Sequence, residues 1–92
     1  MSMSLVVQKT PNPNARKFVL PRIMFERPRN FASVESAAQD PLAARLMALD
    51  GVYNVFCAQD FVTVNKRPEV AWDSLETAAC AVIEDYFGLS IG

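Results

Sequence analysis

The sequence predicts an α+β fold in two layers, in which a mostly antiparallel β-sheet carries two helices packed on one face. Residues 4–20 and 52–65 are rich in β-branched and aromatic side chains separated by turn residues, as in neighbouring strands. Residues 41–49 and 73–87 instead repeat apolar side chains at helical spacing. Each helix has one apolar stripe to bury, and one face of a sheet can cover both stripes.

Length and composition predict one domain. The 92 residues are enough for one hydrophobic core and too few for two, so we expect residues 1–92 to form a single domain. The hydrophobic share of 51% is typical of globular proteins, and no apolar run approaches the ~20 residues that span a membrane. The N-terminus lacks the basic segment followed by a long apolar one that marks a secretory signal. We therefore expect a cytoplasmic location and no membrane partner.

The first two strands are expected at residues 4–9 and near residues 17–20, with a turn between them. The turn, residues 10–15, reads TPNPNA. Its two prolines fix φ and push the residues before them toward extended backbone. Its two asparagines can hydrogen-bond the nearby backbone or accept a positive φ. We expect an ordered and exposed turn.

Residues 21–39 are the hardest segment to interpret. Pro21 and Pro28 interrupt any regular ladder of hydrogen bonds. Residues 23–26 and 30–32 could still form short strands, so we expect edge strands or irregular structure there.

A helix is predicted to follow, because Asp40-Pro41 combines an N-cap residue with proline at the first helical position. Gly51 can take the left-handed conformation that ends a helix. Between them, three leucines recur at the spacing of one apolar face: Leu42, Leu46 and Leu49.

Residues 52–57 and 61–65 predict a β-hairpin, because only three residues separate two segments dominated by Val, Tyr, Phe and Thr. Of these three, Asp60 is expected to accept the unusual backbone angles of the turn. The last helix is expected to begin with a capping box formed by Asp73 and Glu76, and to end at Gly88. Its expected apolar face consists of Leu75, Ala79, Val82 and Tyr86, flanked by Ala78, Ile83 and Phe87.

The absence of histidine excludes several classes of enzyme and metal site. Without histidine the chain has no His-dependent catalytic triad and lacks the commonest transition-metal ligand. Its two cysteines, Cys57 and Cys80, are too few to hold a zinc ion or an iron–sulfur cluster within one chain. The sequence also shows no nucleophile–base pair, no phosphate-binding glycine loop and no carboxylate dyad of the kind used in acid–base catalysis. We therefore expect no enzymatic activity, no cofactor and no metal bound by a single chain.

The cysteines leave two interpretations open. Cys57 lies in a predicted strand and is typical of a buried core residue, whereas Cys80 falls toward the polar side of the last helix and is expected to be partly exposed. Alternatively, two chains could pair, and their cysteines and carboxylates together could hold iron or a cluster.

Charge is divided unevenly along the chain. Residues 1–46 carry seven Lys/Arg against three Asp/Glu, a balance of +4, and residues 47–92 carry two against seven, a balance of −5. A basic run contains Arg16, Lys17, Arg22, Arg27 and Arg29. This run is either a solvated surface or a site for nucleic acid or another anionic partner. The isoelectric point of about 5.2 argues against a dedicated nucleic-acid binder.

Three motifs, taken in order, resemble a known family. Residues 10–18 read TPNPNARKF, residues 40–46 read DPLAARL, and residues 51–66 contain GVYNVF followed by DFVTVNK. With Trp72 at the start of the last helix, these motifs resemble the N-terminal domain of Nfu/NifU-type iron–sulfur cluster scaffold proteins. The resemblance runs from about residue 5 to residue 87.

The resemblance implies recognition of partners and not the carrying of a cluster. In full-length scaffolds a separate C-terminal domain with a Cys-x-x-Cys motif holds the cluster, and this sequence contains no such motif. The expected function is a non-catalytic adaptor or docking module in iron–sulfur cluster biogenesis. Its expected partners are scaffold, carrier or recipient proteins, or a separate cluster-carrying domain.

The expected partner-binding residues lie in the first turn and the strand after it: Thr10, Asn12, Asn14, Arg16 and Lys17. A rigid loop with directed donors suits recognition, although the same prolines and asparagines could simply build the turn. Trp72 is likewise either an anchor at an interface or a cap on the core.

Overall fold

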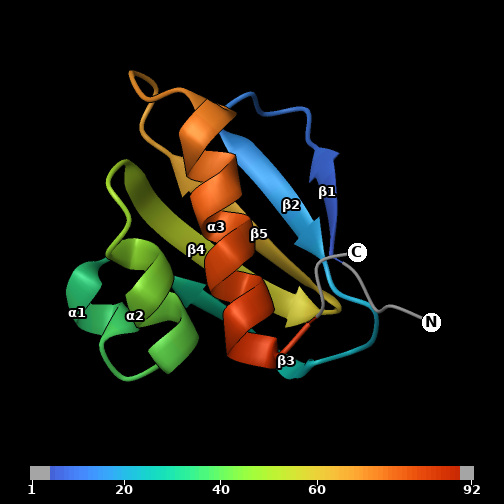
Figure 1. Cartoon of the computed structure of the whole chain (residues 1–92). Helices are drawn as coiled ribbons and strands as arrows, with labels where there is room; N and C mark the ends of the chain where they lie inside the picture. The colour runs from blue at the N-terminus through green and yellow to red at the C-terminus, as the bar shows by residue number, and fades with distance from the viewer. Residues whose placement is uncertain (1–4, 90–92) are drawn as a thin grey trace.

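The computed structural model describes residues 5–89, which form five strands and three helices (Figure 1). The strands are β1 (Val6–Lys9), β2 (Ala15–Val19), β3 (Phe25–Phe31), β4 (Val52–Gln59) and β5 (Phe61–Lys66). The helices are α1 (Val34–Ala37), α2 (Pro41–Met47) and α3 (Trp72–Phe87).

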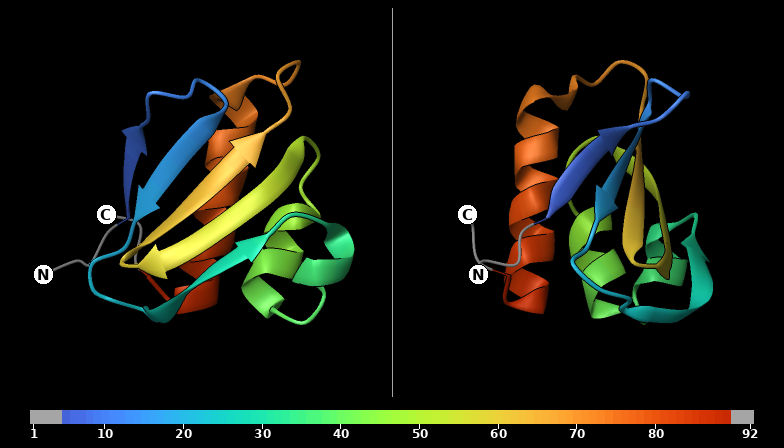
Figure 2. Two further views of the ribbon diagram at one scale, coloured as in Figure 1. Left: turned by 180° about the vertical axis from the view of Figure 1, so that it is seen from behind. Right: turned by 90° about the vertical axis from the view of Figure 1, so that its right-hand side faces the viewer.

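The strands form one antiparallel sheet in the order β1-β2-β5-β4-β3. Helices α2 and α3 lie on one face of this sheet, and the structure describes no helix on the opposite face (Figure 2). The predicted two-layer α+β fold is confirmed. Among residues 5–89, no helix combines the length and the apolar character needed to cross a membrane.

The core lies between the sheet and the helices, because alternate strand residues and one stripe of each helix face the same layer. Its fully buried members include Phe18, Leu42, Leu46, Val55, Val62 and Val64. Helix α3 contributes Leu75, Ala79 and Ile83. The predicted stripe of this helix is partly wrong: Ile83, expected at its flank, continues the buried row of Leu75 and Ala79, while Val82 is half-buried and Tyr86 remains 42% exposed.

The segment between β2 and α2 is more regular than the sequence predicts. The two short strands expected there belong to one edge strand, β3, which includes Pro28. Its pairing with β4 changes register between Phe25 and Arg29, so that the proline does not have to donate to the ladder. Helix α1, which the sequence does not predict, is one turn capped reciprocally by Ser33 and Ser36. A single turn is too short to show helical periodicity.

Two other local predictions are wrong. The positive φ of the β4–β5 hairpin belongs to Gln59 (49°) and not to Asp60, whose carbonyl instead accepts a hydrogen bond from the N–H of Leu20. Helix α3 begins at Trp72, after an N-cap at Ala71 that provides no side-chain cap. The expected capping box at residue 73 is therefore absent, because tertiary contacts of the tryptophan place the helix start.

Candidate functional site

The turn between β1 and β2 is stabilised first by its own side chains. Thr10 Oγ1 donates to the carbonyl of Asn12 (2.8 Å) and accepts from the Asn12 N–H (3.1 Å). Asn12 Oδ1 accepts from the Asn14 N–H (2.9 Å), as in an Asx turn. The Ala15 N–H donates to the Asn12 carbonyl (3.0 Å) and closes the turn. The turn is therefore ordered, as the sequence predicts.

Two residues distant in sequence hold the turn against the domain. Lys66, at the end of β5, donates from Nζ to Asn14 Oδ1 (3.0 Å) and from its backbone N–H to the Asn14 carbonyl (2.8 Å). Trp72, at the start of α3, donates from Nε1 to the carbonyl of Pro13 (2.9 Å). Lys66 is 6% exposed and Trp72 is 8% exposed. We call Asn14, Lys66 and Trp72 the turn anchor.

Arg16 of β2 packs against the turn anchor. Its guanidinium carbon lies 5.1 Å from the centroid of the Trp72 ring, and the Lys66 ammonium lies 5.9 Å from it. Both distances are within the ~6 Å over which a cation is attracted to an aromatic face. Arg16 also forms an ion pair with Glu76 of α3. The indole therefore joins the turn, β5 and α3 at one point.

The five residues predicted to bind a partner do not converge on one surface. The hydroxyl of Thr10 is engaged within the turn, Asn14 Oδ1 accepts from Lys66 of β5, and the guanidinium of Arg16 faces α3. Lys17 faces the opposite side of the sheet, where its ammonium lies 4.3 Å from the centroid of the Phe61 ring. Successive strand residues point to opposite faces, which separates residues 16 and 17. Of the set, the exposed residue at the turn surface is Asn12.

The interpretation of the sequence misses Lys66, although a signal for it is present. In β5, Val62 and Val64 are buried and alternate with half-buried neighbours. Lys66 continues this alternation and must point inward. An inward ammonium needs acceptors, because burying a charge without them is costly. The acceptors come from a turn that lies 52 residues earlier in the chain.

The basic run predicted from the sequence is divided by the fold. Arg16 packs on the turn anchor and Lys17 lies on the uncovered face of the sheet. Arg22 and Arg27 are exposed in and before β3, and Arg29 forms an ion pair with Asp40 (3.0 Å). Among residues 5–89, the basic side chains of this run therefore lie on more than one face of the domain, whereas a nucleic acid backbone favours a single basic face.

The thiols are poorly suited to bind a metal. Cys57 is buried on β4 and Cys80 is half-buried on α3, as the sequence predicts. Burial raises the pKa of Cys57 to about 12 and that of Cys80 to about 11, and nearby carboxylates contribute in the same direction. A metal binds the thiolate, which these environments disfavour. Within the part of the chain that the structure describes, no group of three or more Cys, Asp and Glu residues is placed to hold a metal ion.

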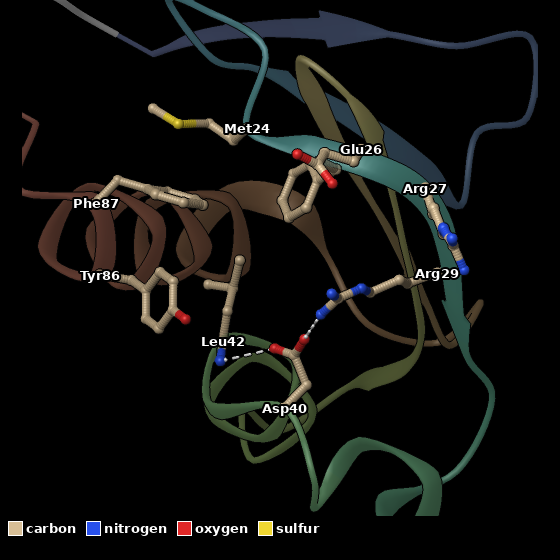
Figure 3. A pocket seen from close by; sticks show the side chains of 9 residues that line it. Met24, Glu26, Arg27, Arg29, Asp40, Leu42, Tyr86 and Phe87 are labelled. Carbon is tan, nitrogen blue, oxygen red and sulfur yellow. Dashed lines mark hydrogen bonds and ion pairs between the residues drawn. The ribbon is translucent and has the colours of Figure 1, made fainter.

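A pocket of about 580 Å³ opens between β3, the start of α2 and the end of α3 (Figure 3). Its apolar lining consists of Met24, Phe25, Leu42, Tyr86 and Phe87. At the other end, Arg29 reaches from β3 to Asp40 (Figure 3). Asp40 also accepts the N–H groups of Leu42 and Ala43 (both 3.0 Å) and thereby caps α2, as predicted.

The sequence of this chain is similar to those of iron–sulfur cluster scaffold proteins. The family model described as "Scaffold protein Nfu/NifU N terminal" matches residues 5–89. NifU-like protein 5, mitochondrial, of Arabidopsis thaliana is 38% identical over 87 residues, which are 94% of this chain and 32% of that protein. The human NFU1 iron-sulfur cluster scaffold homolog, mitochondrial, is also 38% identical over 87 residues, or 92% of this chain and 34% of that protein. The chain thus spans about a third of the length of these curated relatives.

Solved structures share the fold. A NifU-like protein from Saccharomyces cerevisiae has a TM-score of 0.81 at 20% identity, covering 95% of this chain and 80% of that one. Protein SAV1430 from Staphylococcus aureus has a TM-score of 0.76 at 24% identity, covering 89% of this chain and all of that one. At this level of identity the likeness concerns the fold alone.

Proposed function

The chain belongs to the family of Nfu/NifU scaffold N-terminal domains, and we propose that it is a non-catalytic docking module in iron–sulfur cluster biogenesis. Its partners would be iron–sulfur assembly or recipient proteins, or a separate cluster-carrying domain. The observation that carries the proposal is the turn at residues 10–15, which matches the opening motif of the family and is rigidly held by the turn anchor. A loop already ordered before binding loses less conformational entropy when a partner binds.

The five residues would take different parts in docking. Asn12 is exposed and would contact the partner with its amide NH₂ group, since its Oδ1 is already engaged with the turn. Thr10 and Asn14 would set the shape of the turn. Arg16 and Lys17, on opposite faces of β2, would act at the borders of the surface, Arg16 next to α3 and Lys17 on the uncovered face of the sheet.

An anaerobic affinity pull-down from the lysate of the source organism tests this function. The informative bait carries Asn12→Asp, which keeps the Oδ1 acceptor of the turn and replaces the exposed NH₂ by a charged oxygen. The matched control is Asn30→Asp on β3, another exposed asparagine whose Oδ1 accepts a side-chain hydrogen bond, from Asn54. We expect the unaltered chain and the control to enrich iron–sulfur assembly or recipient proteins, and Asn12→Asp to lose about tenfold in capture.

Two results would contradict the proposal in different ways. Failure of the unaltered chain to enrich any such protein would contradict the role in cluster biogenesis. Equal capture by Asn12→Asp and Asn30→Asp would contradict the turn as the contact surface. Iron and sulfide analysis of the purified chain tests the alternative of a metal held between paired chains, and the salt dependence of capture tests an anionic partner.

The cellular location stays a prediction. The sequence leads us to expect the cytoplasm, whereas the plant and human relatives are named as mitochondrial proteins. Fractionation of source cells followed by immunoblotting distinguishes the two locations.

A further inference from the structure

A second pocket, of about 300 Å³, lies against the turn between β1 and β2. It is lined by residues 9–13, 15 and 16, and we call it the turn pocket. The charged residues of this lining are Lys9 and Arg16, and both are basic. The turn pocket therefore has two cations and no carboxylate in its lining, in a concavity large enough to receive a side chain of another molecule.

The positive charge of this lining is only partly compensated within the domain. Lys9 and Arg16 stand directly opposite each other in the pairing of β1 with β2, so they share one face of the sheet, and like charges in this position repel. Arg16 is paired with Glu76, whereas Lys9 is exposed and forms no ion pair with any residue of the described range 5–89. The buried ammonium of Lys66 adds a further positive charge behind the turn, and its hydrogen bonds go to neutral oxygens. Asp73 of α3 is exposed and does not line the pocket.

The polar side-chain groups that remain open in the turn pocket are hydrogen-bond donors. Thr10 Oγ1 donates to the carbonyl of Asn12 and accepts its N–H, and Asn12 Oδ1 accepts another backbone N–H of the turn. The groups left are the NH₂ of Asn12, the ammonium of Lys9 and the N–H groups of Arg16 outside its ion pair. An ionised carboxylate only accepts hydrogen bonds and carries a negative charge. The lining therefore matches a carboxylate in both charge and hydrogen bonding.

We propose that the turn pocket binds an Asp or Glu side chain of the partner protein. Its carboxylate would pair with Lys9 and accept charge-assisted hydrogen bonds from Lys9 and Arg16, with the NH₂ of Asn12 as a third donor. A protein carboxylate is favoured over the phosphates of a nucleic acid, because the next basic residue of the chain, Lys17, lies on the other face of the sheet. This inference deepens the proposed docking function, on which it rests for the existence of a protein partner. It states which group of the partner the turn recognises, and it adds Lys9 to the contact residues.

The experiment uses a phage library of random dodecapeptides panned on the complete chain. Counter-selection uses Lys9→Glu, which reverses the charge of an exposed side chain at the end of β1 and leaves the core intact. We expect the enriched peptides to share an Asp or Glu at a fixed position. A synthetic peptide of the enriched sequence should shift the amide NMR signals within residues 9–16. Replacing its shared Asp or Glu by the corresponding amide should weaken binding about tenfold.

Arg22→Gln is the matched control for the affinity measurement. Arg22 is exposed like Lys9, and its replacement removes the same charge, but it follows the last residue of β2, whereas the turn pocket lies at the first. We expect Lys9→Gln to weaken peptide binding about fivefold or more and Arg22→Gln to change it less than about twofold. Lys9→Arg keeps the charge and should bind within about twofold of the unaltered chain. Circular dichroism confirms that the variants remain folded.

Several results would overturn the proposal. The library could enrich no peptide or peptides without a shared acidic residue, the peptide could shift signals outside residues 9–16, or Lys9→Gln and Arg22→Gln could weaken binding equally. Displacement of the peptide by a single-stranded DNA dodecamer at a lower concentration than by the free peptide would assign the pocket to phosphate groups. The lysate pull-down separates this inference from the function on which it rests. Peptide binding without capture of iron–sulfur proteins contradicts only the role in cluster biogenesis, and capture that Lys9→Gln leaves unchanged contradicts only the carboxylate site.

Discussion

Replacing Lys66 by methionine should destabilise the domain and loosen the turn at residues 10–15. The substitution keeps the length and most of the volume of the side chain and removes the ammonium group. Asn14 Oδ1 then loses its donor, and the carbonyl of Arg67 loses a longer hydrogen bond (3.4 Å). The indole of Trp72 loses one of its two cations.

The expected loss of stability in Lys66→Met is the sum of three contributions. A hydrogen bond from a charged donor contributes about 1.5–3 kcal/mol, and the bond to Asn14 is of this kind. The cation–π contact, at 5.9 Å, is near the limit of its range and adds about 0.5 kcal/mol at most. Methionine avoids the cost of burying an ammonium group, which returns roughly 1 kcal/mol. We expect a net loss of about 1–2 kcal/mol in the free energy of unfolding.

Urea unfolding followed by circular dichroism measures this loss. With a slope of about 1 kcal/mol per molar urea for a small domain, the midpoint should fall by about 1–2 M. A double-mutant cycle with Asn14→Ala isolates the interaction, and we expect a coupling energy of about 1 kcal/mol. Lys17→Met is the control, because Lys17 lies on the uncovered face of the sheet and loses only its contact with the Phe61 ring, about 0.5–1 kcal/mol, while the turn should be unaffected.

Additive free energies in this cycle, or a Lys66→Met variant as stable as the unaltered chain, would refute the turn anchor as a determinant of stability. Hydrogen exchange supplies an independent readout. The amide of Ala15, which donates to the Asn12 carbonyl, should exchange faster in Lys66→Met and unchanged in Lys17→Met.

The remaining predictions concern two glycines, the two thiols and a helix cap. Gly51→Ala should lower the free energy of unfolding by about 2–3 kcal/mol, because φ is +100° and the new Cβ would lie 2.8 Å from Val70 Cγ1. Gly88→Ala, at φ +67° in open space, should lower it by only about 1 kcal/mol in the same urea assay. Alkylation of Cys80 by iodoacetamide should rise about tenfold per pH unit from pH 8 toward its pKa of about 11, and a plateau near pH 9 would contradict this. Because both thiols have higher pKa values in the folded chain than the ordinary 9.0, the stability they contribute is complete below pH 9 and is lost as pH rises toward 11–12. Asp40→Ala should lower the free energy of unfolding by about 1–2 kcal/mol, because α2 loses its N-cap. Arg29→Gln removes only a partly exposed ion pair and should lower it by less than about 0.5 kcal/mol, as thermal unfolding can measure.

Elements with short-range signals could be predicted from the sequence. The β4–β5 hairpin, the Asp40-Pro41 helix start and the TPNPNA turn each depend on residues within a few positions of one another, and the structure confirms all three. The burial of Cys57 and the partial exposure of Cys80 also follow from strand alternation and helical phase. Such elements can be predicted because the hydrogen bonds that form them join residues only a few positions apart in the sequence.

The other features of the fold and of the candidate site depend on contacts between residues far apart in the chain. The start of α3 is placed by the bond from Trp72 to Pro13, which spans 59 positions, and the inward ammonium of Lys66 is satisfied across 52 positions. Arg16 and Lys17 face opposite sides of β2 by strand alternation, but only the tertiary structure decides that α3 covers the side of Arg16 and leaves that of Lys17 open. The pocket between β3 and α3 likewise brings residues 24–29 against residues 86–87. Local patterns carry no information about such pairings, which arise only when the sheet order and the helix positions are set together.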